Sequence, residues 1–143
     1  MKPLTILLAE DNLGDVLLVR QALDEHGISY DLHVARDGAQ ALEFIERIGS
    51  PAGVPCPNIV LLDLNLPKVD GPVVLAELRK QSQCAQTPVI VITSSDAPRD
   101  RERMAQLGIT RYFKKPSDLD AFMELGAIVR GVVEGNPAYL PEP

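Results

Sequence analysis

The chain has 143 residues, of which 45% are hydrophobic and 24% are charged, and its formal net charge is −6. This length fits one domain with one core, and the hydrophobic content excludes a disordered chain. The negative charge repels phosphate backbones and anionic lipid headgroups, so neither nucleic acid nor a membrane surface is expected as a partner.

Neither a targeting segment nor a membrane span is evident. The first apolar run, residues 4–9, is interrupted by Glu10 and Asp11 and is too short for a signal sequence or a membrane helix. Cys56 and Cys84 lie far apart and match no metal or redox spacing, so we expect free thiols in a reducing compartment. The sequence therefore predicts a cytoplasmic protein.

Short segments rich in Ile, Leu and Val predict five strands. In chain order they span residues 4–9, 31–35, 58–63, 88–93 and 111–114. The first, third and fourth are continuously apolar, which is typical of strands buried on both faces of a parallel sheet.

Apolar residues at helical spacing follow each strand. For the first four helices these residues are Val16, Val19 and Leu23; Ala41, Ile45 and Ile48; Leu75 and Leu78; and Met104 and Leu107. The last helix is expected to run from about Ser117 to Val133. Gly27 is expected to end the first helix, Asp37 to cap the second, and Ser117 to begin the last.

Five βα units in succession predict an α/β protein with a doubly wound parallel sheet. For this size the expected topology is flavodoxin-like, with five strands in the order 2-1-3-4-5. Residues 1–134 form the predicted domain. Residues 135–143 form a tail whose three prolines are incompatible with a regular helix.

Polar residues follow four of the predicted strands. They are Glu10 and Asp11, Asp63 and Asn65, Thr93, and Lys115. Ligands of such sheets bind beyond the carboxyl ends of the strands, where the chain direction switches between strands one and three. One acidic residue there is ordinarily a helix cap or a solvated loop end, but several together indicate a site.

The predicted cluster has the chemistry of phosphoryl transfer. Three carboxylates held close together repel one another unless a cation lies among them, and a cluster of hard oxygen ligands suits Mg²⁺. A divalent ion, a lysine and a hydroxyl surround a transferring phosphoryl group favourably. Asp63 ends the central strand and is the best nucleophile; Asp11 would hold Mg²⁺ directly and Glu10 through water.

These motifs resemble the response-regulator receiver domains of two-component signalling. The resemblance covers residues 4 to about 133 and rests on Glu10-Asp11, Asp63-Leu64-Asn65-Leu66-Pro67 with Asp70-Gly71, Thr93, and Lys115-Pro116. It implies that Asp63 is the phosphoacceptor and that Lys115 pairs with the phosphate. It implies that Asp11, Asp63 and the backbone carbonyl of Asn65 bind Mg²⁺. Thr93 and Tyr112 would be the switch residues. It also implies that Glu10 replaces an aspartate and that the Lys115–Pro116 bond is cis.

Finer resemblance points to regulators that are paired with phytochrome histidine kinases. It rests on residues 9–16, 62–68 and 115–118. The expected partner is therefore a sensor histidine kinase of that kind. In the simpler interpretation of the first stretch, Asn12 and Asp15 only cap the first helix.

The resemblance implies a switch and an intermolecular output. Thr93 would bind the phosphate and pull the next loop inward, and Tyr112 would turn inward, changing the face formed by helix four, strand five and helix five. Because only the tail remains after the last helix, we expect the signal to reach a separate downstream protein.

The last helix carries two apolar stripes. One holds Leu119, Phe122, Gly126, Val129 and Val133, and the other holds Ala121, Leu125, Ile128 and Val132. If one stripe packs on the sheet, the other predicts a homodimer, with Tyr139 and Leu140 of the tail reaching across as an arm. The alternative is that a wide stripe simply lies deep within the protomer.

Two other functions fit the topology less well. A magnesium-dependent phosphohydrolase with an aspartate nucleophile needs a second acid two residues later, but Asn65 cannot protonate a leaving group. A flavin carrier needs a Ser/Thr-rich phosphate loop after strand one, where Glu10 and Asp11 would repel the flavin phosphate.

Overall fold

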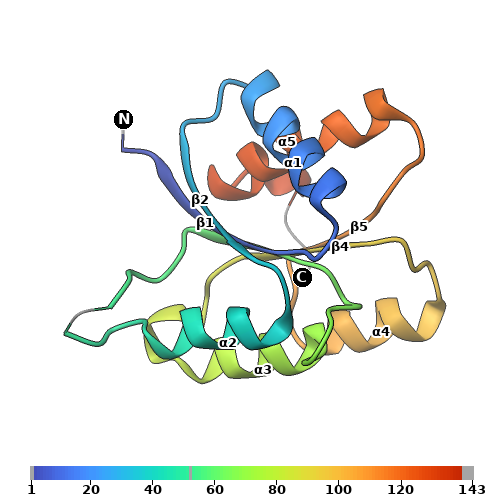
Figure 1. The fold of residues 1–143 in the computed structure, drawn as a ribbon. Coiled ribbons are helices and arrows are strands. Elements are labelled where there is room, and N and C mark those ends of the chain that lie inside the picture. The colour runs from blue at the N-terminus through green and yellow to red at the C-terminus, as the bar shows by residue number, and fades with distance from the viewer. Residues whose placement is uncertain (1, 52, 140–143) are drawn as a thin grey trace.

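The computed structural model describes residues 2–51 and 53–139, which form a central sheet with helices on both faces (Figure 1). The strands are β1 (Leu4–Ala9), β2 (Tyr30–Ala35), β3 (Ile59–Leu62), β4 (Val89–Thr93) and β5 (Arg111–Lys114). The helices are α1 (Leu13–Glu25), α2 (Gly38–Glu46), α3 (Gly71–Lys80), α4 (Pro98–Gln106) and α5 (Leu119–Val133), with short 3₁₀ turns at Ser82–Cys84 and Pro137–Tyr139.

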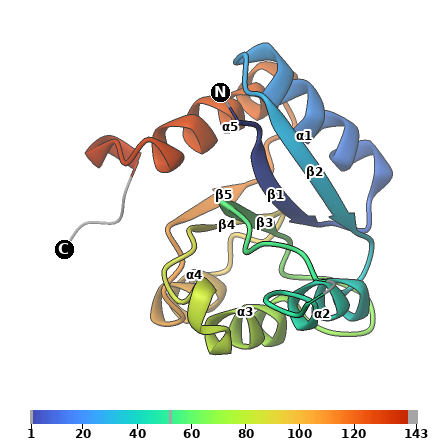
Figure 2. The same ribbon diagram turned by 90° about the vertical axis from the view of Figure 1, so that its left-hand side faces the viewer.

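The sheet has the predicted topology. All neighbouring strands are parallel, in the order β2-β1-β3-β4-β5. Helices α1 and α5 cover one face, and α2, α3 and α4 cover the other (Figures 1 and 2). The flavodoxin-like prediction is confirmed, and the strands run so that β1, β3, β4 and β5 end at the same edge.

Two apolar clusters fill the spaces on either side of the sheet. Alternate residues of β1 point into them: Ile6 and Leu8 pack with α1 and α5, whereas Leu7 packs with α2 and α3. Every residue of β3 and β4 is buried. This explains why the central strands have continuously apolar sequences.

Helix boundaries follow local capping chemistry. The Asn12 side chain accepts a hydrogen bond from the Asp15 amide at 3.0 Å, and Asp37 accepts one from Gln40 at 2.8 Å. Gly27 has a φ of 67°, the left-handed conformation that commonly follows a helix. The last helix begins at Leu119 rather than at about Ser117 as predicted, because Asp118 supplies the capping oxygen.

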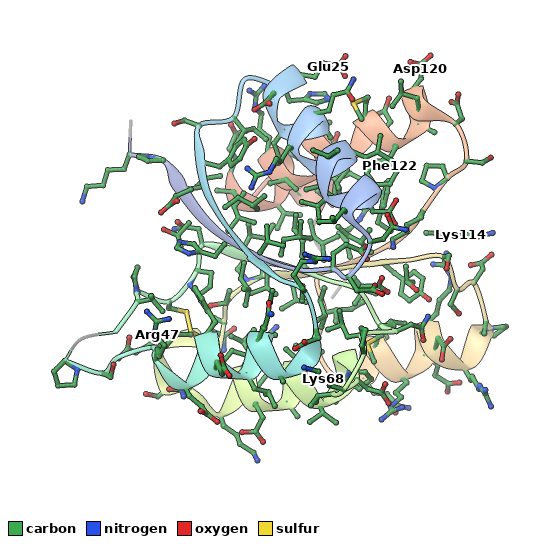
Figure 3. All side chains as sticks on the ribbon, in the orientation of Figure 1. Glu25, Arg47, Lys68, Lys114, Asp120 and Phe122 are labelled. Atoms are coloured by element: carbon green, nitrogen blue, oxygen red, sulfur yellow. A yellow bond between two sulfur atoms is a disulfide. The ribbon has the colours of Figure 1, made fainter. Side chains whose placement is uncertain are left out.

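The two cysteines form a disulfide, so the prediction of free thiols was wrong. Cys56 lies in the loop before β3, and Cys84 lies in the 3₁₀ turn before β4. Because β3 and β4 are adjacent and parallel, the loops that enter them meet at the same end of the sheet, with the Cα atoms 5.9 Å apart. Figure 3 shows the bond in yellow near Arg47.

Helix α5 is buried more completely than its sequence suggested. Leu125 is fully buried and Val132 is 4% exposed, and both belong to the cluster that includes α1. Leu125 and Val132 of the second stripe are thus buried within the chain, whereas Ala121 and Ile128 are half-buried. Leu125 and Val132 need no partner molecule to cover them, and the homodimer through α5 stays a prediction. Tyr139 packs on Gly131 of its own α5, and Leu140 lies outside the described residues.

Within the described ranges, no helix is both long enough and apolar enough to cross a membrane.

Candidate functional site

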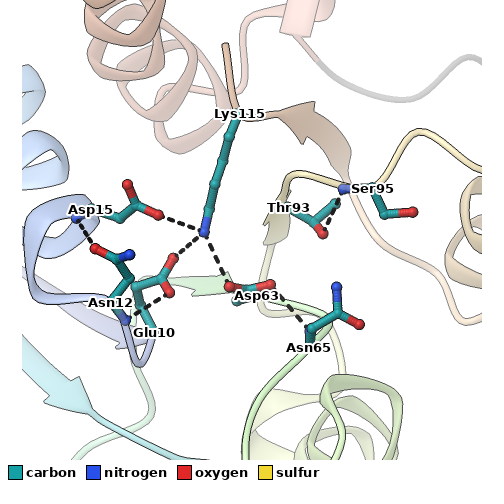
Figure 4. Close-up of polar contacts among 8 residues, drawn as sticks. All are labelled: Glu10, Asn12, Asp15, Asp63, Asn65, Thr93, Ser95 and Lys115. Carbon is teal, nitrogen blue, oxygen red and sulfur yellow. Dashed lines mark hydrogen bonds and ion pairs between the residues drawn. The ribbon is translucent and has the colours of Figure 1, made fainter. Parts of the chain in front are cut away.

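The predicted site residues lie together where the strands end (Figure 4). Glu10 follows β1, Asp63 follows β3 and Lys115 follows β5. Glu10 and Asp63 are buried, whereas Asp11 is exposed. Parallel strands bring residues from three distant segments to this edge, as the topology predicted.

Lys115 links the buried carboxylates. Its Nζ lies 2.6 Å from Glu10 Oε1, 2.7 Å from Asp15 Oδ2 and 3.1 Å from Asp63 Oδ2. The Lys115–Pro116 bond is trans, so the expected cis bond is wrong. The long lysine side chain reaches Asp63 from a trans backbone.

Burial alters the protonation of this cluster. It raises the pKa of Glu10 to about 7, and the negative charge of Asp63 acts in the same direction, against the hydrogen bond from Lys115. Burial alone would lower the pKa of Lys115, but its hydrogen bonds to Asp15 and Glu10 outweigh this effect and raise that pKa above its ordinary value. The lysine is therefore a permanent cation beside Asp63.

The acidic residues are arranged as a cation site requires. Glu10, Asp11 and Asp63 each offer a carboxylate oxygen within 4.8 Å of the others. A hard divalent ion fits this set, because oxygen ligands are what Mg²⁺ prefers and because a cation relieves the repulsion between Glu10 and Asp63. Asn65 lies beside them, and its backbone amide donates to Asp63 Oδ1 at 3.1 Å.

Thr93 and Tyr112 lie on a connected network rather than on the cation cluster. Thr93 is fully buried, and its Oγ1 accepts a hydrogen bond from the Ser95 amide at 3.2 Å. Tyr112 donates from its hydroxyl to the Ser95 carbonyl at 2.8 Å, and the Arg101 guanidinium lies 4.3 Å from the centre of its ring. Ser95 thus joins the two residues expected to act as the switch.

Sequence reasoning missed the roles of three residues. Asp15 was considered as part of the finer resemblance and as a helix-capping residue, but its pairing with Lys115 was not predicted. Ser95 and Arg101 carry no sequence signal of their own, because their contacts with Tyr112 depend on how the loop after β4 folds over β5.

Fold and site together define a class: an α/β protein of flavodoxin-like topology with an acidic site and a lysine at its switch point. Residues 6–126 match the response regulator receiver domain family. The chain is 37% identical over 130 residues to the response regulator Rcp1 of Synechocystis, covering 91% of this chain and 86% of that protein.

Two solved structures resemble nearly the whole chain. The phosphorylated cyanobacterial phytochrome response regulator RcpA has a TM-score of 0.83 at 30% identity, covering 99% of this chain and all of RcpA (100%). The Mn²⁺-bound form of Rcp1 has a TM-score of 0.81 at 34% identity, covering 98% and 100% of the two chains. The chain belongs to the response regulator receiver domain family.

Proposed function

We propose that Asp63 accepts a phosphoryl group from a sensor histidine kinase and that phosphorylation changes which protein the chain binds. The observation that carries this proposal is the buried Asp63 carboxylate, which is held 3.1 Å from the Lys115 ammonium and beside Glu10 and Asp11. A nucleophile, a fixed positive charge and a cation site thus converge at the end of β3.

The transfer needs no other nucleophile from this chain. An Asp63 carboxylate oxygen bonds to phosphorus as the bond from phosphorus to the donor histidine nitrogen breaks, and the electron pair of that bond leaves with the imidazole. Lys115 faces the charge that develops on the phosphoryl oxygens, and its raised pKa keeps it protonated throughout. We expect this chain to promote its own phosphorylation and slow dephosphorylation, without turnover of other substrates.

Magnesium is the proposed cofactor. Asp11, Asp63 and the Asn65 carbonyl would hold it, with Glu10 contributing through water. When bound, the ion neutralises charge on the phosphoryl oxygens and orients them for in-line transfer. The acidic residues of this chain would thus hold the ion beside Asp63, while Lys115 supplies a second positive charge 3.1 Å from the same carboxylate.

Thr93 and Tyr112 are the proposed switch. A phosphoryl group on Asp63 would draw the Thr93 hydroxyl, whose oxygen already accepts from the Ser95 amide. Movement of Ser95 would then act on Tyr112, because the tyrosine hydroxyl is bonded to the Ser95 carbonyl. The outer surface of α4 and β5 would change, and this surface is the proposed contact for a downstream protein.

The proposed kinase is a phytochrome, because Rcp1 and RcpA resemble this chain over most of their length and RcpA is a phytochrome response regulator. A donor histidine must come within bonding distance of Asp63, so the kinase must cover the rim of the site. Leu13 and Leu17 of α1 are 56% and 66% exposed, respectively. These two side chains offer the kinase an apolar contact.

Self-association through α5 has less support than the sequence suggested. Leu119 is the exposed large apolar side chain of this helix, at 48%, and Leu125 and Val132 of the second stripe are buried within the chain. Sedimentation velocity at tens of micromolar, with and without beryllofluoride, tests the homodimer. One species with the mass of a single chain in both conditions would reject it.

The decisive experiment is incubation with acetyl phosphate and Mg²⁺, followed by intact mass spectrometry. We expect one phosphate-sized adduct that is absent without Mg²⁺ and absent in an Asp63→Asn variant. An Asp31→Asn variant, altered at an exposed position of β2, serves as the matched control and should label normally. Failure to label, together with no binding of beryllofluoride, would refute the function, and equal labelling of Asp63→Asn would refute the site.

A further inference from the structure

Asp15 is a third carboxylate on the lysine of the site. Its Oδ2 lies 2.7 Å from Lys115 Nζ, closer than the 3.1 Å between that nitrogen and Asp63. In Figure 4, the lysine extends between Asp15 and Glu10 on one side and Asp63 on the other. The ammonium has three N–H donors, and all three carboxylates lie within reach of them.

The start of α1 fixes the position of Asp15. Asn12 caps the helix by accepting a hydrogen bond from the Asp15 amide, so the backbone of this turn is held firmly. An acidic residue in the first turn of a helix is favourable by itself because of the helix dipole. That effect explains the residue type, but it does not require the side chain to contact Lys115.

We propose that Asp15 is a positioning residue that competes with the phosphoryl group for the Lys115 ammonium. The inference rests on the proposed phosphorylation of Asp63. Before transfer, Asp15 holds the lysine on the α1 side of the site. After transfer, Asp63 is an acyl phosphate whose negative charge lies on the phosphoryl oxygens. Lys115 must then reach beyond the former carboxylate to pair with these oxygens, so its contact with Glu10 or with Asp15 must loosen.

Burial indicates which carboxylate releases the lysine. The Glu10 side chain is 2% exposed and that of Asp63 is 8% exposed, whereas that of Asp15 is 23% exposed. A carboxylate that loses a partner in the interior remains unpaired and desolvated, but one near the surface is solvated by water instead. Asp15 is therefore the partner that the lysine leaves at least cost.

Removing the negative charge of Asp15 should strengthen the binding of phosphoryl analogues. In Asp15→Asn, the amide still accepts a hydrogen bond but no longer competes as an anion. We expect beryllofluoride to bind about 3- to 10-fold more tightly, because the ion pair that competes with it is partly exposed and therefore of modest strength. Phosphorylation by acetyl phosphate should become faster by a similar factor.

The test is a fluorine NMR titration of beryllofluoride at saturating Mg²⁺, with three variants. Asp15→Asn should bind more tightly than the wild type, and Asp15→Glu, which keeps the charge, should bind within about 2-fold of it. Asp70→Asn is the matched control, since Asp70 is an exposed residue beside Asn65 and makes no capping hydrogen bond to α3. It should also bind within about 2-fold of the wild type.

The outcomes separate this inference from the function on which it rests. If the wild type binds beryllofluoride but Asp15→Asn binds equally or more weakly, the competition is refuted. If Asp15→Asn and Asp70→Asn gain equally, the effect is only that of charge near the site, and the proposed role of Asp15 is again refuted. If the wild type binds no beryllofluoride and takes no phosphate, the proposed function itself fails.

Discussion

At the scale of the residue, burial assigns different roles to chemically similar carboxylates. Asp63 and Glu10 are buried and share Lys115, so each has a fixed geometry and a fixed positive neighbour. Asp11 is exposed and is free to add its charge to a cation. Sequence predicts that such residues meet at one edge, but it does not predict how deeply each is buried.

Asp37 shows a pH effect at the same scale. The backbone amide of Gln40 lowers the pKa of this capping carboxyl, and Lys68, 3.3 Å away, acts in the same direction. A carboxyl whose pKa is lower in the folded state stabilises the fold above its unfolded pKa and loses this contribution as the pH falls through the folded value. Its contribution is therefore present at neutral pH and absent in strong acid.

We predict that Asp37→Asn is less stable than the wild type at pH 7 and that this difference disappears as the pH falls below about 4. Asparagine still caps the helix, so the variant isolates the effect of charge. Thermal unfolding of both proteins across this pH range measures it. A difference that stays constant over the whole range would contradict the assignment.

The site residues show what local sequence can reveal. Asp63, Asp11, Thr93 and Lys115 were predicted because each lies at the carboxyl end of a strand or within two residues of it, and strand ends are readable from apolar runs. The pairing of Asp15 with Lys115 was not predicted, because it depends on the distance between α1 and the loop after β5. Two segments separated by most of the chain set that distance.

At the scale of the element, the packing of α5 on α1 depends on one small residue. A Cβ atom added to Gly126 would lie 2.3 Å from the Ala22 carbonyl oxygen and 2.3 Å from the His26 ring. The backbone oxygen belongs to α1 itself, and the half-buried His26 ring is held by a hydrogen bond to the Met123 carbonyl of α5, so a larger side chain would force the helices apart. Gly126 therefore allows the close approach of α5 to the end of α1.

Gly126→Ala should lower the free energy of unfolding by about 1 to 3 kcal/mol, the usual cost of overpacking a core. Chemical denaturation measures this change. Helix propensity alone predicts the opposite sign, because alanine favours a helix by about 1 kcal/mol relative to glycine. An increase in stability would thus show that the two helices are not in close contact at this position.

Strands were predicted more accurately than helix environments for a physical reason. A strand buried on both faces is apolar throughout, so its sequence identifies both the element and its surroundings. The apolar stripes of α5 showed which residues are buried, but not whether the sheet, α1 or a second molecule covers them. The disulfide between Cys56 and Cys84 escaped prediction similarly, since it depends on which strands are neighbours.

At the scale of the whole molecule, the proposed cation would link the site to the stability of the fold. Glu10, Asp11 and Asp63 lie close enough to share one ion, and the pKa of Glu10, raised to about 7, reflects the cost of a buried negative charge there. A ligand that binds only the folded chain stabilises the whole domain by mass action. The whole domain would therefore unfold less readily with the proposed ion bound, although only a few side chains would hold it.

We predict that Mg²⁺ at ten times its dissociation constant raises the free energy of unfolding by about 1.4 kcal/mol and that a chelator reverses this effect. Asp11→Asn should abolish most of the increase. The same variant should be as stable as the wild type without Mg²⁺, or more so, because it removes one of three carboxylates that repel each other. Thermal unfolding of both proteins, with Mg²⁺ and with chelator, gives all four values. If Asp11→Asn were strongly destabilised in chelator, Asp11 would hold the fold together by itself rather than through an ion, and its assignment as a metal ligand would be wrong.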